Sequence, residues 1–226
     1  ADLRDSIHLY EGRSYRIPTI LEEVELTEEA NKQSTEIKKI TSKEFIIFGE
    51  DNKDVISQSE KLKDAVYYLV SGHGGPDPGA MAVYGGKSIA EDEYAYDITL
   101  RLAKELIAHG ATVYIIIRDD DDGIRDERIL EIDHDEVAYG GKTIPLNQVA
   151  RLKQRVDIVN KLHKKNRGKY QRLIVTHVDS RSKSQNIDVF FYHHEKSKNG
   201  KQLAESIHET FQKKYKKYQP NRKLFN

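Results

Sequence analysis

The chain has 226 residues, enough for one α/β domain of ordinary size with a small appendage. Lysine and arginine together number 37, as do aspartate and glutamate, so no net charge draws the protein toward nucleic acid or an anionic membrane. The absence of cysteine excludes disulfides and thiolate metal sites, and no apolar run approaches the roughly 20 residues that span a bilayer. Charged residues make up 33% of the chain, which predicts a highly solvated surface around a compact core.

Residues 1–60 differ in character from the rest of the chain. Short strands are predicted at residues 6–10 and 44–48, on either side of a charged, partly helical stretch at 21–32. We expect an accessory segment over residues 1–60, either a small β-containing domain or an ordered extension. The main domain is then expected over residues 61–226.

From residue 61 onward, predicted strands and helices alternate. Apolar runs predict strands at residues 65–70, 111–117, 172–176 and 187–192. Helical spacing predicts helices at residues 91–109, 146–164 and 200–215, with Gly110 ending the first. The apolar stripes of the first two helices are Tyr94, Ile98, Leu102 and Leu106, and Val149, Leu152, Val156, Val159 and Leu162. This alternation predicts an α/β fold with a mainly parallel central sheet and helices on both faces.

A long acidic insertion occupies residues 119–145. Its aspartate run does not fit the calcium loop of an EF-hand, because the fifth position falls on Gly123 or Ile124. Residues 133–136, Asp-His-Asp-Glu, are interpreted as a solvated loop, with a second metal site as the alternative. Residues 137–144 predict a hairpin with a Gly-Gly turn, and we expect this flap to line the substrate groove.

Three side chains that can bind a metal ion lie at the ends of predicted strands or at the start of a predicted helix. His73 lies in a glycine-rich loop after the first strand, Glu91 opens the next helix, and His177 follows a later strand. Ligands of open α/β sheets bind outside the carboxyl ends of the strands, so these residues are expected to meet. Two imidazoles and a carboxylate with an open fourth position are a recurrent catalytic zinc arrangement. The sequence therefore predicts a Zn²⁺ site formed by His73, Glu91 and His177.

The order of these motifs resembles the zinc-dependent N-acetylmuramoyl-L-alanine amidases, which cut peptidoglycan. The segments that carry the resemblance lie between residues 61 and 215, and they are Gly-His-Gly-Gly-Pro-Asp-Pro-Gly at 72–79, Glu91, Arg118, Arg-Val-Asp-Ile-Val-Asn at 155–160 and Val-Thr-His-Val-Asp at 175–179. The resemblance implies a phosphorylase/hydrolase-like fold and zinc-dependent cleavage of the amide between N-acetylmuramic acid and L-alanine. It further implies a role in cell-wall remodelling or cell separation, in the periplasm or outside the cell, with the signal peptide absent from this chain.

The chain departs from the family pattern in ways that concern the mechanism. Asp179 stands where the family usually has asparagine, and we expect it to orient His177. The family's second glutamate, which assists proton transfer, has no counterpart before Asn226, so the general base is not identified. We expect the C-terminal end of the family domain to be missing from the printed chain. The alternatives are a non-catalytic zinc-containing module that binds peptidoglycan or regulates, and a zinc peptidase of other specificity.

Several other residues have a competing structural interpretation. Glu93 is the rival of Glu91 as a ligand and is expected to face water, whereas Asp77 is expected to hold the glycine loop. Arg118 and Arg155 are expected to pair with acids of the insertion, with substrate contact as the alternative. His109 is interpreted as a helix cap, and the remaining histidines of the C-terminal part, His193, His194 and His208, as surface residues.

Two charged segments bear on possible partners. Some amidases of this family carry a regulatory helix whose acid occupies the zinc, and the acids at residues 22–29 have that chemistry. A solvated helix face is the preferred interpretation there. The basic run at residues 213–223 is interpreted as a solvated face, with contact to an anionic cell-wall polymer as the alternative. A regulatory protein partner is compatible with the resemblance.

Overall fold

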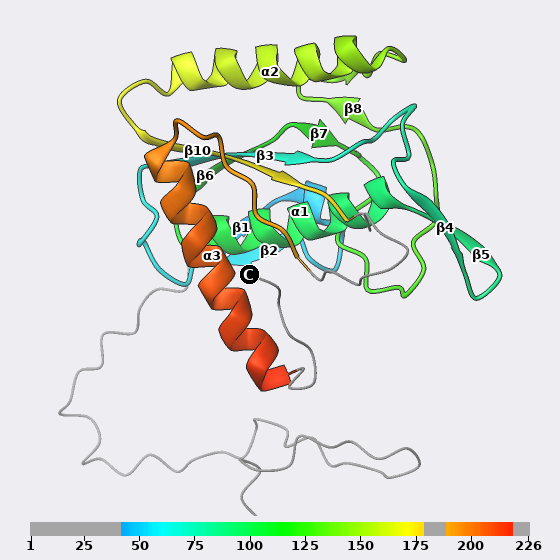
Figure 1. Cartoon of the computed structure of the whole chain (residues 1–226), viewed down its shortest axis with the longest axis horizontal. Helices are drawn as coiled ribbons and strands as arrows, with labels where there is room; N and C mark the ends of the chain where they lie inside the picture. The colour runs from blue at the N-terminus through cyan, green and yellow to red at the C-terminus, as the bar shows by residue number, and fades with distance from the viewer. Residues whose placement is uncertain (1–41, 179–188, 219–226) are drawn as a thin grey trace, which may run out of the picture. The chain divides into compact units, whose positions relative to one another are not determined.

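The structure is a computed structural model, and it describes residues 42–178 and 189–218 (Figure 1). The chain divides into two units, Ala1–Lys39 and Ile40–Asn226. The strand predicted at residues 6–10 and the acidic stretch at 21–32 lie outside the described residues. The described residues all belong to the second unit.

A three-stranded parallel sheet forms the centre of this unit. Strand β3 (Ala65–Ser71) lies between β10 (Tyr170–Thr176) and β6 (Thr112–Ile115), and every pairing is parallel. All seven residues of β3 are buried, as expected for a central strand covered on both faces. Strands were predicted at all three places, and the parallel arrangement is confirmed.

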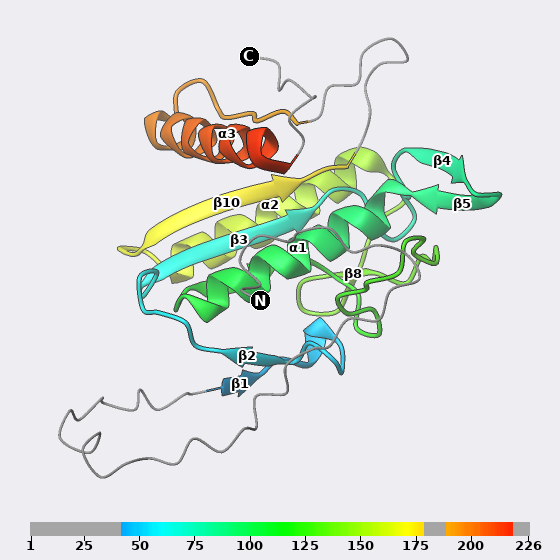
Figure 2. The ribbon, with the colours of Figure 1, turned by 90° about the horizontal axis from the view of Figure 1, so that it is seen from below.

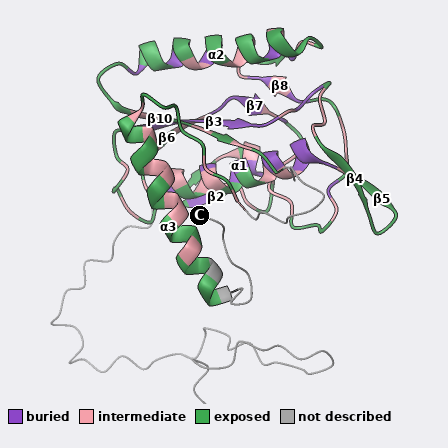
Figure 3. Ribbon diagram, viewed as in Figure 1, coloured by how far each residue is buried: buried purple, intermediate pink, exposed green. Residues whose placement is uncertain are grey.

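Two helices cover opposite faces of this sheet (Figures 1 and 2). Helix α1 (Glu91–Ala108) packs on the face formed by alternate β3 residues such as Leu69, and helix α2 (Gln148–Lys165) packs on the face that contains Tyr68. The buried residues accordingly follow β3 and the inner sides of the helices (Figure 3). The α/β class is confirmed, whereas a phosphorylase-like arrangement is not.

The apolar stripes predicted for the helices only partly face the core. In α2, Val149, Leu152 and Val156 are exposed, and the helix packs through Ile158 and Leu162. These two residues share a face with Arg151 and Arg155, at i, i+4, i+7 and i+11, and both arginines turn toward the loop of His73. In α1, Ile98 is similarly exposed, while the most deeply buried positions include Ala95, Leu100 and Ala103.

Short elements surround the sheet. Strands β1 (Ser42–Glu44) and β2 (Asp54–Ile56) pair antiparallel, and between them lies the 3-10 helix η2 (Ile46–Phe48). The strand predicted at residues 44–48 is therefore mostly wrong, since the chain turns at Gly49 (φ 79°) and directs Phe48 into the core beneath α1. A hairpin of β4 (Met81–Tyr84) and β5 (Lys87–Ala90), turning at two glycines, was not predicted.

The insertion contains the predicted hairpin. Strand β8 (Val137–Ala138) pairs with β9 (Lys142–Thr143) across Gly140 and Gly141, whose φ angles of 84° and 70° suit a Gly-Gly turn. Strand β8 also pairs with β7 (Ile117–Arg118), which continues the second predicted strand.

The C-terminal described segment ends in helix α3 (Lys198–Tyr218), as predicted. The strand predicted at 187–192 is wrong for residues 189–192, which form no strand, and its first two residues lie outside the described part. Among the described residues, no helix has both the length and the apolar character that a membrane span requires.

Candidate metal centre

The loop that follows β3 holds His73 in an unusual backbone conformation. His73 has φ 65°, in the left-handed region that costs a residue with a side chain on the order of 1–3 kcal/mol. The loop is closed by a hydrogen bond from Gly74 N to Asp77 O (2.8 Å), and the guanidinium of Arg155 donates to the carbonyl oxygen of His73. These contacts from the loop and from α2 hold His73 at the carboxyl end of the sheet.

The structure brings the three residues of the predicted metal site together. Glu91 Oε2 lies 3.2 Å from His73 Nε2, and Glu91 Oε1 lies 2.9 Å from His177 Nδ1. The two imidazole rings are 5.0 Å apart between centroids and meet edge to face. One ligand atom from each of the three residues lies within 4.8 Å of the others. The residues come from the loop after β3, the first turn of α1 and the end of β10.

Glu91 is the centre of this cluster and is held as a carboxylate. Besides the two histidines, it accepts hydrogen bonds from the backbone N–H groups of Ala80 (3.0 Å) and Val178 (3.3 Å). Burial by itself would raise the pKa of Glu91, but these hydrogen bonds, the one with His177 and the charge of His73 bring the pKa below its ordinary value. An ionised carboxylate is the form that binds a metal ion.

Asp77 organises the other side of His73. Its Oδ2 lies 3.2 Å from His73 Nδ1, without the geometry of a hydrogen bond, and accepts a hydrogen bond from Arg151 (2.7 Å). Burial would raise the pKa of Asp77, but His73 and Arg151 lower it below the ordinary value. The expected role of Asp77 in the glycine loop is confirmed, since Gly79 N also donates to it.

Glycine is required at two positions beside the histidines. A Cβ at Gly72 would lie 2.4 Å from the His177 ring, and one at Gly79 would lie 2.7 Å from the His73 ring. Gly79 also has φ 71°, which side chains rarely adopt. The glycine pattern of the loop thus serves the close approach of the three cluster residues.

The cluster opens to solvent on one side. The side chain of Glu91 is 2% exposed, whereas those of His73 and His177 are 26% and 48% exposed. The carboxylate is buried and the two imidazoles are partly exposed, so a further ligand can reach the cluster from solvent. Catalytic zinc sites keep such an open coordination position, whereas structural zinc sites do not.

A comparison with protein families agrees with this geometry. The family model described as N-acetylmuramoyl-L-alanine amidase (Amidase_3) matches residues 68–225, which include all three cluster residues. The chain belongs to this amidase family. Searches of curated proteins and of solved structures gave no match.

In this amidase-family chain, Glu93, Arg118 and Arg155 were each expected to have a particular partner or exposure. Glu93 was expected to face water, but it is buried and paired with Arg125 at 2.9 Å, because the first turn of α1 lies under the insertion. Arg118 pairs with Asp120 of the insertion, as expected. Arg155 does not pair with the insertion; it binds the His73 carbonyl instead.

His109 is the C-cap residue of α1, as predicted, and the side chains of His193 and His194 are exposed. His208, also predicted at the surface, is only partly buried. Asp179, expected to orient His177, lies outside the described residues, as do the acids at 22–29.

Residues 133–136 were considered as an alternative metal site, but the sequence reasoning missed that Glu136 meets Asp92 and Glu93 beside the candidate metal centre. Asp92, Glu93 and Glu136 are all buried, with one carboxylate oxygen each within 4.8 Å of the others. Burial raises the pKa of Glu136 to about 8, and burial with the charge of Glu93 raises that of Asp92 to about 6. Within the insertion, two further groups share Asp119: with Asp122 and Asp133, and with Asp121 and Asp135. The sequence signal for these groups was the presence of acids in the first turn of a predicted helix together with an acidic insertion.

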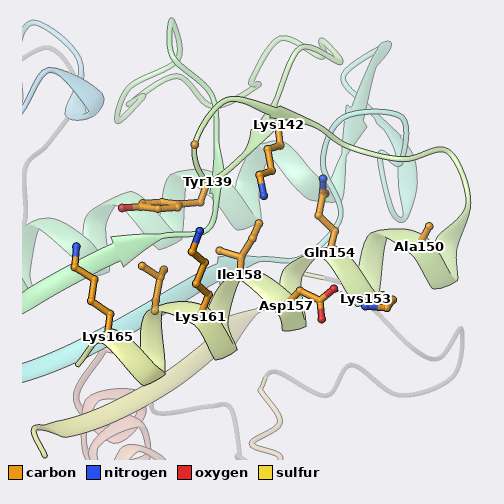
Figure 4. Close-up of a pocket in the computed structure, with 11 residues that line it drawn as sticks. Tyr139, Lys142, Ala150, Lys153, Gln154, Asp157, Ile158, Lys161 and Lys165 are labelled. Carbon is orange, nitrogen blue, oxygen red and sulfur yellow. Dashed lines mark hydrogen bonds and ion pairs between the residues drawn. The ribbon is translucent and has the colours of Figure 1, made fainter. Parts of the chain in front are cut away.

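A groove separate from the cluster lies between α2 and the β8–β9 hairpin (Figure 4). It has a volume of about 900 Å³ and is lined by Tyr139 and Lys142 of the hairpin segment and, from α2, by Lys153, Lys161 and Lys165 among others. None of the residues that line it belongs to the His73 cluster. The hairpin therefore lines a lysine-rich groove, and the substrate-binding role of that groove stays a prediction.

Proposed function

We propose that this protein is a zinc-dependent amidase that hydrolyses the bond between N-acetylmuramic acid and L-alanine in peptidoglycan. The observation that carries the proposal is the convergence of His73, Glu91 and His177 in a chain that belongs to the amidase family. The substrate class follows from the family, and a periplasmic or extracellular location with a role in cell-wall remodelling would follow from that substrate.

The donor set fits zinc. Tetrahedral zinc lies about 2.0–2.2 Å from nitrogen and oxygen ligands, so neighbouring ligand atoms are about 3.3 Å apart. Glu91 contacts the two ring nitrogens through different oxygens, at 3.2 Å from His73 Nε2 and 2.9 Å from His177 Nδ1, and one ligand atom of each residue lies within 4.8 Å of the others. We propose His73 Nε2, Glu91 and His177 Nδ1 as the ligands.

The chain's own residues would position the reaction. Zinc, when bound, supplies a Lewis acid that polarises the scissile carbonyl and lowers the pKa of water. Glu91 stays ionised through its hydrogen bonds, and Asp77 places a carboxylate beside Nδ1 of His73. Asp179 is proposed to orient His177. We assign no residue as the general base that passes the proton to the leaving amine.

Digestion of purified sacculi tests the proposal. The zinc-loaded protein should release stem peptides with a free N-terminal L-alanine, identified by mass spectrometry. His177→Ala should lose both zinc and activity, whereas His193→Ala, at an exposed histidine, should keep both.

The same assay separates the competing functions. Sacculus binding without peptide release would support a non-catalytic module, and cleavage within the stem peptide would support a peptidase. Zinc retained at full stoichiometry in His177→Ala would show that the ligand set is wrong.

A further inference from the structure

Three buried acids next to the proposed zinc centre take no part in it. Asp92 and Glu93 belong to the first turn of α1, and Glu136 precedes β8 in the insertion. Their exposed fractions are 1%, 2% and 5%. Acids are favourable near a helix N-terminus, but an exposed acid obtains that benefit without the cost of burial. The helix dipole therefore does not explain why the three are buried together.

Among the described residues, the ion pairs of this group involve one cation, Arg125. Arg125 binds Glu93 at 2.9 Å, but the same guanidinium also binds Asp122. Glu136 accepts a hydrogen bond from Gly75 N at 2.6 Å, a contact that supplies no full charge. In the part of the chain that the structure describes, no ion pair reaches Asp92 or Glu136, and a divalent cation would supply the missing partner.

An oxygen within the group lacks a partner. Asp92 Oδ1 accepts a hydrogen bond from Glu93 N at 3.1 Å, whereas the buried Oδ2 has no hydrogen-bond partner among the described residues. Buried acceptors in native proteins are nearly always satisfied, by the protein, by water or by an ion. Because Asp92 is 1% exposed, a bound cation is a natural partner for Oδ2.

We propose that Asp92, Glu93 and Glu136 bind a second divalent cation, Ca²⁺ or Mg²⁺, distinct from the zinc. An all-carboxylate donor set suits these hard cations, whereas zinc prefers the nitrogen ligands of the neighbouring centre. The two aspartate groups around Asp119 are weaker candidates, because Asp119 Oδ1 already accepts two backbone hydrogen bonds and Asp121 and Asp135 are exposed.

The second cation would stabilise the loop that contains His73. Glu136 holds Gly75, two residues from His73, and Asp92 adjoins Glu91 in the first turn of α1. A cation that joins Glu136 to Asp92 and Glu93 therefore ties the loop of His73 to the helix of Glu91. Its role is structural, and the ligand sets of the two ions are separate.

Thermal denaturation of the zinc-loaded full chain tests the proposal. Ca²⁺ or Mg²⁺ at about a hundredfold excess over its Kd should raise the Tm by roughly 5–10 °C, with K⁺ at equal ionic strength as the control. Isothermal titration should give one ion per chain. If neither cation binds or shifts the Tm, the proposal is overturned.

Matched variants test the location. Glu136→Gln keeps an oxygen for Gly75 N but removes a charge, so it should abolish the cation-dependent shift. Asp92→Asn provides the same readout should Glu136→Gln fail to fold, and Glu127→Gln, at an exposed acid of the same insertion, should respond like the wild type. A wild-type response in Glu136→Gln or Asp92→Asn would place the ion elsewhere and contradict the proposal.

One further variant separates this inference from the proposed function. His177→Ala should lose zinc yet still bind Ca²⁺ or Mg²⁺ with the same stoichiometry. If cation binding disappears together with zinc, the two sites are one, and the second site is refuted.

Discussion

His73 adopts a left-handed backbone because its loop fixes it from several sides. Arg155 binds its carbonyl oxygen, Asp77 lies beside Nδ1, and Glu91 lies beside Nε2. The strain is local and is offset by contacts that form only in the assembled loop. The residues that place the imidazole are therefore as important to a metal centre as the imidazole itself.

Gly79→Ala tests how closely the cluster is packed. The new Cβ would lie 2.7 Å from the His73 ring and would adopt φ 71°, so we expect a loss of about 1–3 kcal/mol in the free energy of unfolding and at least a tenfold weaker zinc affinity. Gly86→Ala is the control, because its φ is 79° but its Cβ would meet nothing within 4 Å. Chemical denaturation and zinc titration measure both. Equal zinc affinity in the two variants would contradict the packing argument.

Asp119 provides a test of pH dependence away from the metal centre. Burial raises its pKa from 3.8 to about 7 in the folded protein. The unfolded state therefore loses this proton first, and the free energy of unfolding should fall as the pH rises from about 4 to about 7. Asp119→Asn keeps the oxygen that accepts from Asp121 N and Asp122 N, so it should lack this fall and be more stable than the wild type at pH 8.

Denaturation with urea at pH 5 and pH 8, in the presence of a chelator, measures the effect of Asp119. Asp51→Asn, at an exposed aspartate, should follow the wild type at both values. An Asp119→Asn variant that loses as much stability between pH 5 and pH 8 as the wild type would refute the assignment.

Among the elements, α2 contacts both the glycine loop and the lysine-rich groove. Arg151 and Arg155 reach the glycine loop, whereas Ile158 and Leu162 pack against the sheet and also line the groove beneath the β8–β9 hairpin (Figure 4). Lysines of α2 line the same groove. Peptidoglycan stem peptides carry carboxylates, which a lysine-rich groove would attract. The helix therefore joins the metal loop to a candidate binding surface.

Charge reversal tests whether this groove binds the substrate. Lys142→Glu combined with Lys161→Glu should weaken sacculus binding several-fold at low salt while zinc content stays unchanged, because both lysines line the groove and neither contacts the metal cluster. Co-sedimentation with sacculi measures binding. The control is Lys43→Glu with Lys87→Glu, at exposed lysines outside the groove. Equal binding by the two double variants would exclude the groove from substrate recognition.

At the scale of the whole molecule, features with a local cause were predictable. The buried run of β3, the Gly110 end of α1 and the Gly-Gly hairpin each depend on adjacent residues, and all were confirmed. The convergence of His73, Glu91 and His177 also followed, because carboxyl ends of parallel strands meet at one edge.

The predictions that were wrong concern features that depend on contacts between residues distant in sequence. Whether Glu93 is exposed depends on how the insertion folds over α1, and Arg125, its partner, lies 32 residues away. The inward face of α2 is set by Arg151 and Arg155 reaching the loop of His73, so the predicted stripe is confirmed only at its C-terminal end. Such pairings leave no periodic signal in a single sequence.

The most direct test of the account is the position of zinc in a crystal of the zinc-loaded protein. Anomalous diffraction recorded on both sides of the zinc absorption edge identifies the ion independently of activity. We predict one strong zinc peak within about 2.0–2.2 Å of His73 Nε2, a Glu91 carboxylate oxygen and His177 Nδ1. A zinc peak elsewhere, or none in an active protein, would contradict the account.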